Sequence, residues 1–260
     1  MLEIRQYISL LGLGFLALVA QVLLFREVVA VFEYNELGIG AFYTTWLFWV
    51  GVGALLGRRE GRWGAGLGRH FSSAVLGYIP LYVVQHILVT HARGLAGVQA
   101  YDLFPLAAMF GMMVLVNAPV SLLTGFLFPV ACRWAGRFGG IPAGRVYAFE
   151  CLGACLGGIF ATALLWRHAC GQTVFLWACV LALAAFAAGK DWWRIAILGV
   201  LAVVSVCDVP GNLGRRWAAV EDRAAWSRLL PAETYSGSFA TARGRYLYGE
   251  RREQFIAMSG

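Results

Sequence analysis

The chain has 260 residues, of which 60% are hydrophobic and only 13% are charged, with a formal net charge of +7 and a mean hydropathy of +0.69. Because globular proteins carry about 25% charged residues, these values exclude an ordinary soluble domain. They also exclude a disordered chain and indicate an integral membrane protein.

Seven apolar segments follow one another along the chain. A spanning helix needs about 20 predominantly apolar residues, and the first six segments meet that length easily. The seventh is weaker, because Arg194 and Asp208 lie at its edges. The expected spans are residues 8–32, 37–57, 71–91, 103–132, 146–167, 170–189 and 192–209. We therefore expect an all-α membrane protein, a bundle of about seven transmembrane helices.

The basic residues of the loops predict the orientation of this bundle. With seven spans, and with the eight arginines of the C-terminal tail left out, ten Lys and Arg residues fall on the side of the N-terminus and three fall on the other side. Since cytoplasmic loops carry the excess of basic residues, the N-terminus is expected in the cytoplasm. The C-terminal tail would then lie on the opposite side. If residues 192–209 lie only in the membrane interface, the tail is cytoplasmic instead.

Residues 210–260 form an extramembrane tail. Its composition changes at Pro210, where charged residues become frequent. Tyr235 to Thr241 alternate larger and smaller residues, Arg243-Gly244 is typical of a turn, and Tyr246-Leu247-Tyr248 resumes the alternation. This pattern predicts a β-hairpin. Since a lone hairpin is only marginally stable, we expect the tail to need a partner, the membrane surface or further chain.

Two glycine pairs predict close helix packing. Gly53 and Gly57 end the second span, and Gly153 and Gly157 lie in the fifth. Glycines spaced by four residues allow two helix backbones to approach closely within a membrane. The contact is expected within the bundle, with an oligomer interface as the alternative.

Three strongly polar side chains lie deep inside apolar spans. At about 1.5 Å of helix rise per residue, Gln21, His86 and Asn117 share one depth in the outer half of the bilayer. Because an unpartnered amide or imidazole in lipid is costly, we expect all three to face the bundle interior and at least two to share a network. A structural clasp, a pocket for a quinone or small amine, and haem ligation by His86 are the three interpretations.

Three charged residues are candidates for an ion pair or a proton site. Arg26 and Glu27 fall at the outer end of the first span, and Glu150 lies just inside the cytoplasmic boundary of the fifth. Charges near helix ends can reach water, so a local pair or an interface anchor explains the first two. Glu150 either pairs with loop arginines or serves as a proton or cation site.

Three motifs in the bundle are similar to those of bacterial membrane-fused spermidine synthase-like proteins. The matching segments are Ala20–Glu27, Pro119–Val130 and Gly144–Ala154, although Glu150 stands where that family commonly has Asn. In the tail, residues 233–235 and 246–249 resemble the opening strands of aminopropyltransferases. The resemblance covers about residues 8–190 and extends weakly into the tail.

The resemblance implies an aminopropyltransferase domain in which a Gly-rich loop and an acidic residue bind decarboxylated S-adenosylmethionine and an Asp acts as base. These 260 residues contain no such loop after a strand. We therefore expect no catalytic, cofactor-binding or metal-binding residues, and no aminopropyl transfer by this chain unless a catalytic domain follows residue 260.

The sequence favours a non-catalytic membrane subunit or anchor of this family in the bacterial inner membrane, which docks another membrane or extramembrane protein. The alternatives are a transporter of polyamines or other cations, and the membrane part of a truncated aminopropyltransferase. The expected partners are the lipid bilayer and a protein subunit, without nucleic acid. No cofactor is expected.

Overall fold

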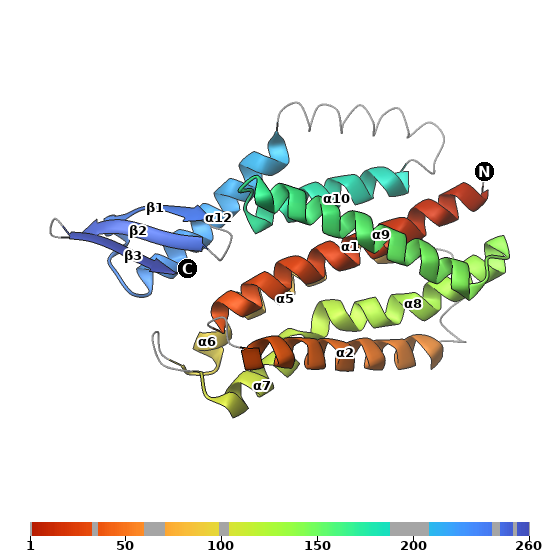
Figure 1. Cartoon of the computed structure of the whole chain (residues 1–260), viewed down its shortest axis with the longest axis horizontal. Coiled ribbons are helices and arrows are strands. Elements are labelled where there is room, and N and C mark those ends of the chain that lie inside the picture. Colours follow the sequence, from red (N-terminus) through yellow and green to blue (C-terminus); the bar gives the residue numbers. More distant parts are fainter. Residues whose placement is uncertain are drawn as a thin grey trace.

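The computed structural model describes residues 2–32, 36–59, 71–98, 104–187, 208–240, 245–251 and 254–259. Long helices form a bundle, and a small β-sheet lies beyond the end of the bundle that is opposite the start of the first helix (Figure 1). The sequence prediction of a mainly helical protein is therefore confirmed.

Helix α1 (Leu2–Val31) lies at the centre of the bundle (Figure 1). It packs against α9 (Ala143–Trp166), α10 (Gly171–Ala187) and α5 (Tyr78–Thr90). A helix that is apolar on every side is suited to such a position. Its fully buried side chains are Leu10, Leu13, Leu16, Val19, Ala20, Leu23, Leu24 and Val28.

A second helix pair, α2 (Glu36–Arg59) and α8 (Ala118–Gly139), completes the bundle. Within the described residues, α1, α2, α8 and α9 are long and apolar enough to cross a membrane, while α5, α7 (Leu106–Val116) and α10 are shorter apolar helices. The helices are thus compatible with a membrane protein. The expected seven helices of spanning length are not shown.

Two segments expected to be single spans are interrupted. Residues 103–132 contain α7 and α8, which meet at Asn117, because Pro119 lacks an N–H group and cannot continue the regular hydrogen bonds. Residues 71–91 contain α4 (Phe71–Val75) and α5, separated by a turn at Gly77. A short helix, α6 (Ala92–Leu95), follows α5.

All four glycines predicted to mediate packing lie at helix–helix contacts. A Cβ atom at Gly153 would overlap the carbonyl oxygen of Leu11, and one at Gly53 would overlap that of Leu122. A Cβ at Gly57 or Gly157 would come within 2.7 Å of a carbonyl oxygen of the facing helix. The α1–α9 and α2–α8 pairs are therefore closer than larger side chains would allow.

The C-terminal part contains an amphipathic helix and a sheet. Helix α12 (Val209–Ser227) leads through a 3-10 turn, η1 (Ala232–Thr234), into strands β1 (Tyr235–Ala240), β2 (Arg245–Arg251) and β3 (Gln254–Ser259). The strands form an antiparallel sheet in the order β1-β2-β3. The expected hairpin is β1–β2, and β3 extends it.

The sheet is held on α12 by Trp226. Its ring is fully buried beside Gly249, where a Cβ would come within 2.6 Å of the indole. The indole Nε1 donates to Thr234 Oγ1 at 2.9 Å, and Ser238 Oγ donates to Asp222 Oδ2 at 2.5 Å. Helix and sheet thus form one unit, which we call the end module (residues 208–240, 245–251 and 254–259).

The predicted seventh span, residues 192–209, lies almost entirely outside the described residues. The helices before and after this segment, α10 and α12, are described. Helix α12 begins beside Thr173 in the first turn of α10, whereas α10 ends at Ala187, about 24 Å of helix rise away.

Candidate functional site

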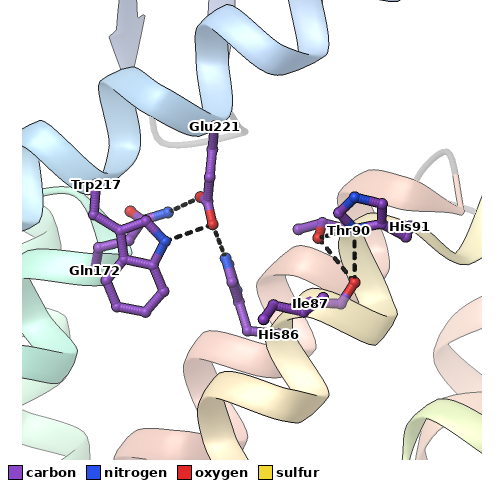
Figure 2. Close-up of polar contacts among 7 residues, drawn as sticks. All are labelled: His86, Ile87, Thr90, His91, Gln172, Trp217 and Glu221. Carbon is purple, nitrogen blue, oxygen red and sulfur yellow. Dashed lines mark hydrogen bonds and ion pairs between the residues drawn. The ribbon is translucent and has the colours of Figure 1, made fainter.

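The end module is attached to the bundle where α5, α10 and α12 meet. Four side chains of this contact are joined by hydrogen bonds, and we call them the α12 junction (Figure 2): His86 on α5, Gln172 on α10, and Trp217 and Glu221 on α12. Trp217 and Glu221 are four residues apart, so they lie on the same face of their helix.

The junction is built around the carboxylate of Glu221. His86 Nε2 lies 2.7 Å from Glu221 Oε1, and because a carboxylate only accepts hydrogen bonds, Nε2 is the donor. Gln172 Nε2 donates to Oε2 at 2.6 Å, and Trp217 Nε1 donates to Oε1 at 2.7 Å. Each of the three helices therefore contributes a polar group to one carboxylate.

Burial makes these hydrogen bonds important. The side chain of His86 is 1% exposed and that of Glu221 is 22% exposed, while Gln172 is also buried. A buried donor that loses its partner retains the full cost of its desolvation. The junction therefore resists separation of α12 from the bundle.

Glu221 is ionised at neutral pH. Its burial raises its pKa, but the hydrogen bond from His86, the charge of His86, and the hydrogen bonds from Trp217 and Gln172 together lower the pKa below the usual value of 4.5. The carboxylate is thus stabilised in its charged form by the groups that it joins.

Aromatic rings fix the position of His86. Tyr82, one helical turn earlier, stacks on Phe175 of α10 with ring centroids 3.7 Å apart and lies parallel to the His86 ring at 5.9 Å. Trp217 meets the imidazole edge-on at 5.4 Å. The imidazole is therefore held between α5, α10 and α12 with Nε2 directed at Glu221 (Figure 2).

Small residues allow α12 to approach α10 beside the junction. A Cβ at Gly214 would overlap Thr173, whose hydroxyl donates to the Gly211 carbonyl at 3.5 Å. The spacing of buried residues along α12 is four, through Gly214, Ala218, Asp222 and Trp226. This spacing in the sequence could have predicted α12 as a helix with one buried face. It does not identify Glu221 as the partner of His86, and sequence analysis did not predict that pair.

Of the three polar residues predicted to cluster, His86 and Asn117 are buried and Gln21 is half-buried. Within the described residues, hydrogen bonds do not join them into one network. His86 bonds to Glu221, Asn117 belongs to a separate cluster, and Gln21 joins neither among the described residues.

Asn117 lies at the centre of a cluster that joins α2, α5 and α8. Its Nδ2 donates to Thr45 Oγ1 at 2.7 Å, and its Oδ1 accepts from Gln85 Nε2 at 3.4 Å. Gln85 Oε1 in turn accepts from the backbone N–H of Val120 at 2.9 Å, in the first turn of α8. Such first-turn N–H groups lack an intrahelical partner, so Gln85 caps α8 from a neighbouring helix.

Of the three charged candidates, Arg26 and Glu27 are neighbours on α1, and Glu150 lies apart from them on α9. Arg26 and Glu27 are half-buried near the end of α1, and a Cβ at Gly171 of α10 would come within 3.8 Å of Glu27 Oε1. Glu150 is half-buried on α9, where its backbone carbonyl faces Gly14 of α1. Glu27 therefore belongs to the end of the bundle that carries the α12 junction, and Glu150 does not.

Within the part of the chain that the structure describes, no three His, Cys, Asp or Glu side chains gather as a metal site would require. Comparison with protein-family models, curated proteins and solved structures finds no match for the chain.

Proposed function

We propose that this chain is a non-catalytic membrane subunit that anchors its end module at the membrane surface for docking by a partner protein. The observation that carries the proposal is the α12 junction. Three buried or half-buried donors from three helices converge on Glu221, so the bundle fixes the position of the module instead of merely tethering it. A fixed module costs a partner less ordering entropy on binding.

The basic residues at one end of the helical bundle support an orientation of the chain in the membrane. Arg58, Arg133, Arg137 and Arg145 lie at the end of the bundle where α1 begins, and Arg133 Nη2 donates to the Gly57 carbonyl there at 2.6 Å (Figure 1). Basic residues favour the cytoplasmic side. We therefore place the start of α1 in the cytoplasm and the end module on the opposite side of a bacterial inner membrane.

The motif resemblance to membrane-fused spermidine synthase-like proteins is part of the same proposal. The segments Ala20–Glu27, Pro119–Val130 and Gly144–Ala154 lie on α1, α8 and α9, and α1 contacts both of the other helices. These motifs thus belong to neighbouring helices of the bundle.

The test is stoichiometric co-purification of the tagged full chain from its native membranes in mild detergent, measured by native mass spectrometry. We expect one partner protein at a constant ratio to the wild-type chain. Glu221→Ala should lower that ratio because it frees α12, whereas Glu221→Gln, which preserves the shape of the side chain, should retain most of the partner. A wild-type chain that is recovered alone in every detergent would refute the proposal.

A further inference from the structure

Glu150 lies on the buried face of α9. The buried residues of this helix are Val146, Gly153, Gly157 and Ala161. Glu150 is four residues after Val146 and three residues before Gly153, so it shares their face of the helix. Its backbone carbonyl meets Gly14 of α1, where a Cβ atom would overlap it. An acidic residue therefore stands at a helix contact that small and apolar residues otherwise form.

Glu150 also lies inside a helix that is long and apolar enough to cross a membrane. It is seven residues after Ala143, the first residue of α9, which corresponds to about 10 Å of helix rise. Its side chain is half-buried, and Tyr147 and Leu152 beside it are 60% and 52% exposed on a face that lipid would cover. A glutamate is shorter than the Lys and Arg side chains that extend along a helix to water. Its carboxyl group therefore lies in largely apolar surroundings.

The carboxyl group of Glu150 has no counter-ion among the described residues. No described Lys, Arg or His side chain forms an ion pair with it, and no described side chain donates a hydrogen bond to it. Arg133 of α8 donates to the carbonyl of Gly57 at 2.6 Å instead. Arg145, five residues earlier on α9, lies about 140° away around the helix, at about 100° per residue. The described arginines near the start of α9 therefore do not neutralise this carboxyl group.

The titratable groups around Glu150 carry no positive charge. Its charge acts on the hydroxyl of Tyr78 on α5, the thiol of Cys132 on α8 and the hydroxyl of Tyr147 on α9. On α1, Tyr7 lies at this level, with its ring against that of Phe149. The other helix in contact with α9 is α10, whose one described titratable side chain is Cys179. Phenols and thiols are neutral at neutral pH unless they are perturbed, so none of these groups compensates a carboxylate.

We propose that Glu150 is a proton-binding site within the membrane and exchanges its proton with the cytoplasm at the end of the bundle where α9 begins. An ionised carboxylate without a partner is very costly in apolar surroundings, and the bound proton removes its charge. Metal cations such as Ca²⁺ and Mg²⁺ need several oxygen ligands. Within the described residues, no three His, Cys, Asp or Glu side chains gather to supply them. This site goes beyond the docking function and does not depend on it.

The first experiment is labelling of the full chain in its native membranes with dicyclohexylcarbodiimide, an apolar reagent that modifies protonated carboxyl groups. The proton of the carboxyl group moves to one nitrogen of the carbodiimide while a carboxyl oxygen bonds to the central carbon. The acyl group then moves from that oxygen to a nitrogen, so the product retains every atom of the reagent. We expect peptide mass spectrometry to find this addition on Glu150 at neutral pH, and the labelled fraction to fall as the pH is raised.

Variants and a second reagent serve as controls. Glu150→Gln should abolish the label, whereas Glu27→Gln, which removes a half-buried acid at the opposite end of α1, should retain it. A water-soluble carbodiimide with an added amine should modify the exposed Glu233 and Glu250 and spare Glu150. A wild-type chain that is not labelled at Glu150 would overturn the proposal. Protection of Glu150 by excess Na⁺ at neutral pH would also overturn it, because it would identify an alkali cation as the occupant.

Infrared spectroscopy of the full chain in lipid nanodiscs is a second measurement, which does not depend on the access of a reagent. A protonated carboxyl group has a C=O stretching band that a carboxylate lacks. We expect such a band in the wild-type chain at neutral pH, its loss in Glu150→Gln and its retention in Glu27→Gln. Identical spectra of the wild-type chain and Glu150→Gln in this region would contradict the proposal.

Membrane vesicles of opposite orientation test the side of exchange, which rests on the orientation proposed above. In inverted vesicles, whose cytoplasmic face is outside, a change of external pH should change the labelling of Glu150 at once. In vesicles of native orientation it should not. A response in vesicles of native orientation alone would overturn the cytoplasmic access. A chain that is labelled at Glu150 but recovers no partner protein would refute the docking function and leave the proton site standing.

Discussion

Removing the Glu221 carboxylate should release α12 from the bundle without unfolding the bundle. In Glu221→Ala, His86 and Gln172 lose their acceptor while they are 1% and 2% exposed, and Trp217 loses its acceptor in a half-buried position. Hydrogen bonds to a charged group contribute about 1.5–3 kcal/mol each, but they are not additive and water reaches the 22% exposed carboxylate. We expect a loss of about 3–5 kcal/mol in the free energy of docking.

The matched variant is Glu221→Gln. Its amide oxygen can still accept from His86 and Trp217, and Gln172 can turn its own amide to present an oxygen to the new NH2 group. The charge is lost while the hydrogen-bond count is nearly retained, so we expect a cost of only about 1–2 kcal/mol.

Hydrogen exchange of the full chain in lipid nanodiscs measures the difference. Since about 1.4 kcal/mol corresponds to a tenfold change, amides of α12 should exchange about 150-fold to 4,000-fold faster in Glu221→Ala and about tenfold faster in Glu221→Gln. Amides of α9 serve as the internal control and should not change. Equal exchange in both variants, or equal acceleration of α9 and α12, would refute the assignment of the junction as a local clamp.

Three further predictions follow from the same structure. The pKa of Glu221 is lowered in the folded protein, so the contribution of this carboxylate to docking is complete above the usual pKa of 4.5 and is lost as the pH falls through the lowered value. Distances between labels on α12 and α10 should increase over this pH range in the wild-type chain. The same distances in Glu221→Gln should not change with acid. Asn117→Ala should destabilise the bundle by about 1–2 kcal/mol in denaturation by detergent, because it removes the bonds to Thr45 and Gln85. Gly153→Ala should cost about 2–3 kcal/mol in the same assay because its Cβ meets the Leu11 carbonyl, whereas Gly144→Ala, with open space around it, should not destabilise.

The two networks show how far the position of a residue along a helix can be predicted. His86 and Asn117 were expected at one depth, and both are buried. The depth of a residue in the membrane follows from counting residues along its helix. The direction of its side chain depends on how the helix is rotated about its axis, and the side chains of adjacent residues point in directions that differ by about 100°. Gln85 therefore faces Asn117, while His86 faces α12.

The interruption at Asn117 has a similar explanation. An uncharged segment of 30 residues is long enough for one span, and its lack of charge gives no reason to divide it. Pro119 removes a backbone donor, and Gln85, 35 residues earlier in the chain, supplies an acceptor to the N–H of Val120. The break is stable because Gln85 on a different helix, α5, accepts a hydrogen bond from the buried N–H of Val120, which has no acceptor within α8.

The sequence alone determined the apolar helices, the close-packing glycines and the hairpin, because each depends on side chains within a few residues of one another. The docking of α12 on the bundle follows from long-range packing and from no local pattern. Glu221 and His86 are 135 residues apart, and the three donors meet the carboxylate only after α5, α10 and α12 have packed. Local patterns encode which residues are apolar or polar, whereas long-range packing selects the partner of each buried polar group.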